Sequence, residues 1–140
     1  MKKTFLFFAA FLLFGLVSLK AQSTLYLATD VCFSKLDSTG VWGDWGEWIE
    51  DDSEITIDFD NDEIVFYDSF WDLEIYYTIS DYTEETADED GDLITEFHCF
   101  DEEFSKVRVK LLKRISEEDQ RTEIYFYYES SAEAYIVIGE

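Results

Sequence analysis

The chain has 140 residues, of which 33 are acidic and 10 are basic, so its formal charge at pH 7 is −23. Such a charge repels phosphate backbones and anionic membranes, which excludes nucleic-acid binding and favours cationic partners, metal ions or solubility alone. Hydrophobic residues make up 47% of the chain and aromatic residues 19%. These fractions are typical of a folded domain and not of a disordered chain.

The N-terminal segment has the order of a secretory signal peptide. Lys2 and Lys3 precede an apolar run over residues 5–19, and the short stretch Lys20 to Gln22 follows it. An apolar helix of this length is too short to span a bilayer comfortably. We therefore expect a helical signal peptide over residues 1–21 and a single β domain over residues 22–140. The protein would be exported, either periplasmic or secreted, with no membrane contact after cleavage.

Period-two alternation of apolar and polar residues, the signal of β-strands, recurs along the rest of the chain. Short acidic turns separate these segments, and no segment has the period of a helix, so neighbouring strands should be antiparallel. The sequence predicts an all-β antiparallel meander of about eight or nine strands that closes into a small barrel, with a two-layer β-sandwich as the alternative. The clearest of the predicted strand segments are 25–33, 55–59, 64–66, 73–79, 107–111, 124–128 and 136–138.

Two cysteines, Cys32 and Cys99, follow the predicted signal peptide. In an oxidising compartment such a pair can persist as a disulfide. Closing so long a loop would stabilise the fold by roughly 4 kcal/mol in the chain-entropy model. The alternative, two separate buried thiols, remains open because the spacing of the cysteines favours neither.

Acidic residues dominate the segment 36–105, which has no lysine or arginine. We interpret most of them as a solvated face and polar turns, and we expect no cofactor. The alternative is a Ca²⁺ site at Asp58, Asp60 and Asp62, because clustered carboxylates bind hard cations. A second candidate loop covers residues 88–92. Neither segment has the glycine and closing glutamate of an EF-hand loop.

Basic residues gather in the segment 106–121. Lys106, Arg108 and Lys110 alternate and should share one face of a strand, where Glu96 and Glu123 on neighbouring strands would lie opposite them. Cross-strand pairs of opposite charge are mildly stabilising, so we expect ion pairs. The alternative is a site for an anionic ligand, which requires unpaired bases.

Catalytic motifs are absent from the sequence. It has one histidine, His98, and none of the motifs of serine hydrolases, nucleotide-binding proteins or zinc proteases. We interpret His98 as a sheet residue. A carboxylate pair of the glycosidase type cannot be located from sequence, because its spacing depends on the fold.

The stretch VWGDWGEW over residues 41–48 holds three of the four tryptophans. In a regular strand Trp42 and Trp48 would share one face and Trp45 the other, so we expect Trp42 and Trp48 to pack inward and Trp45 to be more exposed. The tryptophans would either close the core or form an aromatic platform for a sugar ring or a partner loop.

The W-G-x-W stretch over residues 45–48, ahead of the I-x-I-D pattern over residues 55–58, resembles small exported β-rich proteins of unknown function. That resemblance implies no activity. From the residues we predict a monomeric binding or interaction module that binds its ligand through Trp42, Trp45 and Trp48. The ligand would be a glycan or a cationic protein, and the module would act like an inhibitor. The alternative is a glycan-active hydrolase with a carboxylate pair.

Overall fold

The strands of the protein form one continuous antiparallel sheet in a computed structural model that describes residues 23–118 and 120–139. The predicted signal peptide over residues 1–21 lies outside the described residues. The strands are β1 (Ser23–Lys35), β2 (Ile49–Glu50), β3 (Glu54–Asp58), β4 (Glu63–Asp68), β5 (Leu73–Tyr82), β6 (Thr86–Ala87), β7 (Leu93–Phe100), β8 (Lys106–Lys113), β9 (Thr122–Tyr127) and β10 (Ser131–Gly139).

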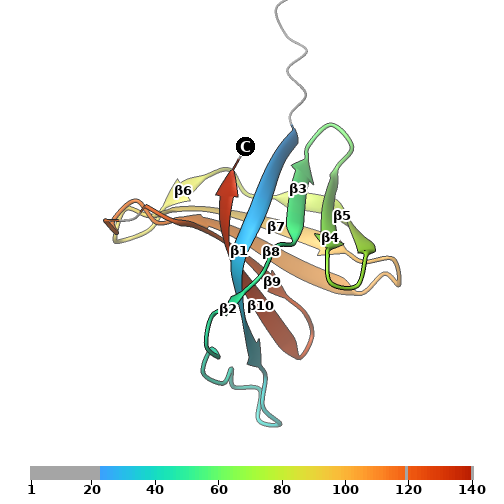
Figure 1. Ribbon diagram of the computed structural model, residues 1–140, viewed down its shortest axis with the longest axis horizontal. Helices are drawn as coiled ribbons and strands as arrows, with labels where there is room; N and C mark the ends of the chain where they lie inside the picture. Colours follow the sequence, from blue (N-terminus) through green and yellow to red (C-terminus); the bar gives the residue numbers. More distant parts are fainter. Residues whose placement is uncertain (1–22, 119, 140) are drawn as a thin grey trace, which may run out of the picture.

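The sheet closes on itself as an eight-stranded barrel (Figure 1). Strands β3, β4, β5, β7, β8, β9 and β10 follow β1 in chain order around the barrel, and β10 pairs with β1 to close it. The short strands β2 and β6 are additions that pair with β1 and β7. The predicted all-β meander and its closure into a barrel are therefore confirmed. In the described part of the chain, no helix has the length and apolar character needed to cross a bilayer.

Apolar side chains from the alternating strand positions fill the barrel. Large residues with almost no exposed surface, such as Phe97 and Phe126, lie at its centre. The ring of Phe126 contacts those of Phe66, Tyr77 and Tyr135, with centroids 5.9, 5.5 and 5.8 Å away. Eight strands leave an interior just wide enough for side chains to fill. Period-two alternation thus produces a packed aromatic core.

One end of this core contains a partly buried acid, Glu133, among tyrosines. The Tyr135 hydroxyl donates to Oε2 of Glu133 at 2.8 Å, and the hydroxyls of Tyr77 and Tyr128 share a hydrogen bond of 2.9 Å. Burial raises the pKa of Glu133 above its usual range, and it also raises the pKa of Tyr77 to about 12. The neutral forms of these groups are therefore favoured inside the barrel.

Three turns share one five-residue geometry, and each begins with aspartate. In each, the first residue's N–H donates to the fifth residue's carbonyl, and its carboxylate accepts the N–H groups of the third and fifth residues. Aspartate initiates turns by this hydrogen bonding, so it performs in this proline-free chain a task often given to proline. The turns are 37–41, 88–92 and 101–105.

The fourth residue of each turn has a positive φ angle: 82° at Gly40, 87° at Gly91 and 62° at Phe104. Glycine adopts this conformation freely, whereas a bulky residue is strained in it. We therefore expect Phe104→Gly to raise the free energy of unfolding by about 1 kcal/mol, measured by urea denaturation. Phe104→Ala is the control, because it removes the exposed ring but keeps the strain. Equal stabilisation by both changes would contradict this explanation.

Cys32 and Cys99 are both buried as free thiols, so of the two alternatives that the sequence leaves open, the structure has two separate thiols and not the disulfide. Cys99 belongs to the barrel core on β7. Cys32 follows the core residue Val31 on β1 and therefore points to the opposite face of the barrel wall. The two side chains point to opposite sides of the wall, so the observed alternative is two separate thiols.

Candidate functional site

The tryptophan-rich segment runs along the edge of β1. The N–H of Gly43 donates to the carbonyl of Lys35, and the N–H of Gly46 donates to the carbonyl of Phe33, each at 2.9 Å. The segment therefore advances three residues for every two residues of β1. A Cβ atom on Gly43 would lie 3.3 Å from the Lys35 oxygen, so this close approach favours glycine.

This three-residue advance points all three tryptophans over the outer face of the barrel. Their side chains reach β9 or the residue just before it: Trp42 lies 6.0 Å from the Tyr127 ring and Trp45 lies 5.6 Å from the Tyr125 ring, while the Arg121 guanidinium lies 5.8 Å from Trp48. The prediction that Trp45 faces away from Trp42 and Trp48 is wrong, because the segment lacks the two-residue period of a strand.

Small residues on β1 and β10 make room for these rings. On the outer face of the barrel between β1 and β9, four buried residues have small side chains: Cys32, Ser34, Ala132 and Ala134. The Ser34 hydroxyl also donates to the Gly43 carbonyl at 2.9 Å. The exposed fractions of Trp42, Trp45 and Trp48 are 40%, 40% and 38%. Each indole therefore packs on the barrel and still keeps accessible surface.

Basic side chains of β8 lie next to the two tyrosine rings of β9 that the tryptophans contact. The Arg108 guanidinium lies 4.3 Å from the Tyr127 ring, and the Lys110 ammonium lies 4.5 Å from the Tyr125 ring. Burial lowers the pKa of Lys110 below its usual range. Cation–π contacts of this kind are favourable and hold the cationic groups in place against the rings.

Glu123 is a buried acidic residue that binds the charged side chains next to these rings. It is fully buried and accepts from Arg121 at 2.6 Å, from Arg114 at 3.1 Å and from the Tyr125 hydroxyl at 2.5 Å. Arg108 pairs with Glu96 at 3.4 Å. The expected ion pairing of Lys106, Arg108 and Lys110 is confirmed only for Arg108, which pairs with Glu96. Glu123 pairs instead with Arg114 and Arg121, and in the described part of the chain Lys106 and Lys110 form no ion pair.

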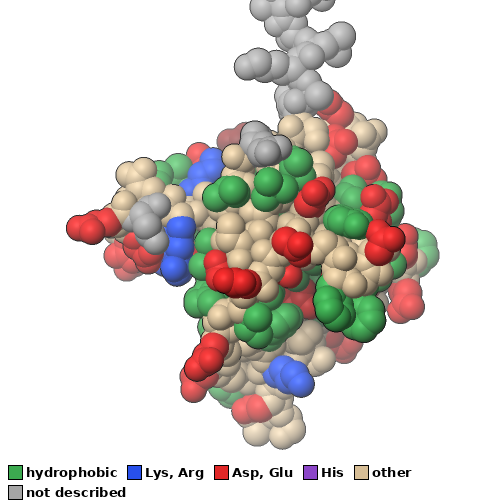
Figure 2. Space-filling model, viewed as in Figure 1, with side chains coloured by type: hydrophobic (Ala, Val, Ile, Leu, Met, Phe, Trp, Pro, Cys, Tyr) green, Lys and Arg blue, Asp and Glu red, His purple; other side chains and the backbone are tan. Residues whose placement is uncertain are grey.

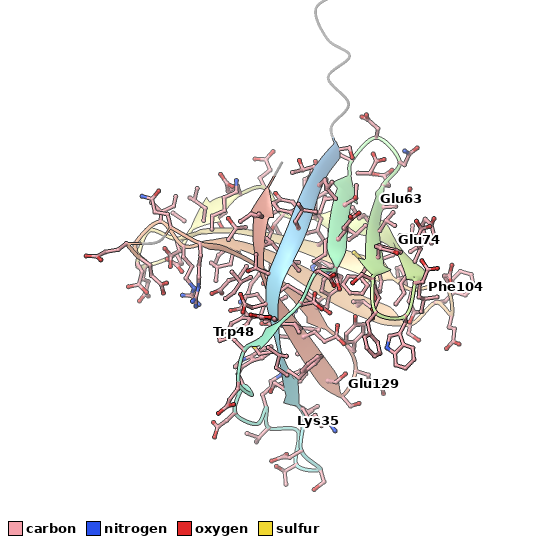
Figure 3. All side chains as sticks on the ribbon, in the orientation of Figure 1. Lys35, Trp48, Glu63, Glu74, Phe104 and Glu129 are labelled. Atoms are coloured by element: carbon pink, nitrogen blue, oxygen red, sulfur yellow. The ribbon has the colours of Figure 1, made fainter. Side chains whose placement is uncertain are left out.

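A notch opens in the barrel wall where β8 and β9 separate. Strand β8 begins at Lys106, but its pairing with β9 begins only at Arg108, opposite Tyr127. The two adjacent hairpins then diverge: Phe104 lies at the tip of one and Glu129 at the tip of the other (Figure 3). A pocket of about 970 Å³ lies at this separation.

The notch combines aromatic, basic, acidic and hydroxyl groups. Its lining includes Trp42, Ser80, His98, Cys99, Asp101, Ser105, Lys106, Arg108, Tyr127, Tyr128, Glu129 and Ser130. Within the described residues, the side chains of His98 and Lys106 make no hydrogen bond or ion pair. Hydrogen-bond donors and acceptors therefore lie beside the exposed indole of Trp42, in a pocket of the size that small ligands occupy.

Nucleophilic catalysis has little support in the notch. Burial raises the pKa of the Cys99 thiol to about 12, so the thiol stays protonated at neutral pH. The notch also has two carboxylates, Asp101 and Glu129. One oxygen of Asp101 already accepts two backbone N–H groups in its turn. Glu133, whose pKa is raised, is not among the residues that line the notch.

The candidate calcium residues lie in the turn between β3 and β4. The Asp58 carboxylate accepts from the backbone N–H groups of Asp60 and Asn61 and from the Asn61 side chain, so it stabilises the turn itself. Asp62 has a φ angle of 52°. Across residues 23–118 and 120–139, no group of histidine, cysteine or acidic side chains has the arrangement of a metal site. Calcium binding at Asp58, Asp60 and Asp62 stays an untested prediction.

The sequence indicates only part of the notch. Of the three predicted tryptophans, Trp42 lines the notch, whereas Trp45 and Trp48 lie outside the lining. The basic face with Lys106 and Arg108 is visible in the sequence, but the neighbouring positions of His98, Tyr127 and Glu129 are not. The outward alternation of His98, Arg108 and Tyr127 on three strands is a signal that a register prediction could have used. Comparison with known proteins found no matching family model, curated protein or solved structure.

Proposed function

We propose that the protein is an exported binding module and that the notch between β8 and β9 holds a glycan. The observation that carries this proposal is the half-exposed indole of Trp42 in the wall of a polar pocket. Sugar rings have apolar faces that stack on aromatic side chains, and their hydroxyls need both donors and acceptors. The notch offers all of these groups, and the Tyr127 ring supports Trp42 from the side.

The hydrogen bonding and location of the acidic groups favour binding of a glycan over its hydrolysis. A glycosidase needs one carboxyl kept protonated as the general acid and a second carboxylate across the scissile bond. Asp101 is engaged in its turn through one oxygen, and the partly buried Glu133 bonds to Tyr135 of the barrel core. Glycan hydrolysis remains the alternative because Asp101 and Glu129 both line the notch. Release of reducing ends from a bound oligosaccharide would support it.

Trp42→Ala is expected to weaken binding of a glycan identified on an oligosaccharide array by at least tenfold, because it removes the aromatic wall. The measurement is isothermal titration calorimetry. Trp48→Ala is the matched control, since Trp48 belongs to the same array and is almost equally exposed but does not line the notch. Its affinity should stay within about twofold of that of the unmodified protein. Equal losses in the two variants, or none in Trp42→Ala, would refute a site in the notch.

A further inference from the structure

The turn between β4 and β5 presents an exposed aromatic pair, Phe70 and Trp71, which we call the aromatic tip. Their side chains are 81% and 72% exposed, and their rings make an edge-to-face contact with centroids 4.8 Å apart. Most of the surface of each ring therefore faces solvent. The barrel core does not need these rings, so packing does not explain the choice of two large aromatic residues.

Hydrogen bonds hold the aromatic tip in one conformation. Asp68 Oδ1 accepts the backbone N–H groups of Phe70 and Trp71 at 2.9 and 3.1 Å. The Tyr67 hydroxyl donates to Asp72 at 2.9 Å, and the Ser69 hydroxyl donates to Asp52. A preorganised aromatic pair loses little conformational entropy when it docks, which is a property of residues that dominate binding energy at interfaces.

The surroundings of the aromatic tip are acidic. Asp52, Asp68 and Asp72 bond within or beside the turn, and the chain has no lysine or arginine between Leu36 and Ser105. Figure 2 shows acidic side chains spread widely over one face, with hydrophobic side chains between them and few basic ones. A partner must therefore offer an apolar cleft and positive charge around it.

The neighbouring turn adds a third exposed ring. Phe104, at the tip of the β7–β8 hairpin, is 85% exposed despite its positive φ angle. Its hairpin adjoins β5, the strand that follows the aromatic tip, because β5 pairs with β7 and begins at the end of the barrel where β7 ends. Figure 3 labels Phe104 and, on β5, Glu74. Strained residues at exposed positions often have a functional reason. Both turns lie at the same end of the barrel.

From this charge and exposure we infer that the aromatic tip is a docking site for a basic protein. Phe70 and Trp71 insert into an apolar cleft of that protein, and the acidic residues around the turn face its basic rim. Phe70 and Trp71 do not line the notch, so the inference does not depend on glycan binding.

The test compares two probe proteins of one fold and opposite charge: hen lysozyme, which is basic, and α-lactalbumin, which is acidic. At low ionic strength the field of the whole chain attracts any basic protein, so binding is measured in about 0.15 M salt, where distant charges are screened. We expect lysozyme to bind and α-lactalbumin not to bind. The double variant Phe70→Ala/Trp71→Ala should weaken lysozyme binding by at least about thirtyfold.

Phe33→Ala is the control, because Phe33 is an exposed aromatic residue on β1, outside this turn. It should leave the affinity within about twofold of that of the unmodified protein. The exposure of Phe70 and Trp71 means that the double variant should fold normally. Unchanged lysozyme binding by the double variant, equal binding of both probes, or no lysozyme binding in this salt would each overturn the inference.

Two other occupants are checked with the same double variant. Self-association of the unmodified protein in sedimentation velocity, abolished in the variant, would assign the aromatic tip to a second copy of the chain. Tip-dependent binding to phosphatidylcholine vesicles would assign it to a lipid surface. Either result would replace the basic protein as the occupant.

Discussion

Replacement of Glu123 by alanine should lower the free energy of unfolding by about 3 kcal/mol, because it removes the acceptor that Arg114, Arg121 and Tyr125 share. Glu123 is fully buried, whereas the two arginines are partly exposed and can regain some hydration. The loss should therefore lie at the lower end of the range for broken buried ion pairs. Chemical denaturation measures it.

Glu96→Ala is the matched control, since Glu96 forms a longer and more exposed ion pair with Arg108. Exposed pairs contribute about 1 kcal/mol or less, so this variant should remain close to the unmodified protein in stability. Similar losses in the two variants would mean that burial of Glu123 adds nothing to its ion pairs.

The same residue should shape stability in acid. Burial alone would raise the pKa of Glu123, but hydrogen bonds from Tyr125 and Arg114 and the nearby positive charges outweigh it and lower the pKa below its usual value. A carboxyl with a lowered pKa in the folded state stabilises the fold above its unfolded pKa of about 4.3. That stabilisation is lost as the pH falls through the folded value.

Glu133 has the opposite effect on the pH profile. Its pKa is raised, so its contribution to stability falls as the pH rises above about 4.3 towards its folded value. The comparison of the unmodified protein with Glu123→Gln isolates the effect of Glu123, since Glu133 is present in both. An unchanged acid limb of the stability profile in Glu123→Gln would contradict the assigned shift.

Phe126→Ala should lower the free energy of unfolding by about 4 kcal/mol, the largest effect that we expect from a single change. Its ring is the shared contact of Phe66, Tyr77 and Tyr135 inside the barrel. Truncation leaves a cavity that these large, stiff rings cannot easily fill. Thermal or urea unfolding provides the measurement.

Phe70→Ala removes the same side chain from the surface and serves as the control. Because Phe70 is largely exposed, the change should stay within about 0.5 kcal/mol. A loss at Phe126 that is no larger than the loss at Phe70 would contradict the central place of Phe126 in the core.

The strands could be predicted because one face of each packs on the core. Alternation at Ile55 and Ile57, or at Val107 and Val109, corresponds directly to burial in the barrel. The orientation of Trp45 could not be predicted in the same way. Its segment takes its spacing from the backbone of β1, to which it bonds at every third residue. The sequence does not show that partner.

The notch forms where the pairing between β8 and β9 stops, and the local sequence pattern does not reveal that point. His98, Arg108 and Tyr127 each look like ordinary outward strand residues, and only the register of β7, β8 and β9 aligns them. Where β8 separates from β9, Tyr128 and Glu129 also line the pocket. Sequence reasoning lacked this register, so it predicted the basic face but not the pocket.

The closing seam between β1 and β10 joins the two ends of the described chain. Leu27 pairs with Ile138, so β10 must be present before β1, which also pairs with β3, gains its second neighbour and the barrel closes. Contacts this distant in sequence are slow to form, and a chain shortened before β10 would leave β1 and β9 with unpaired edges. During synthesis the barrel must therefore stay open until β10 has emerged. Loss of β10 would turn the closed wall into an open sheet edge, which is a template for aggregation.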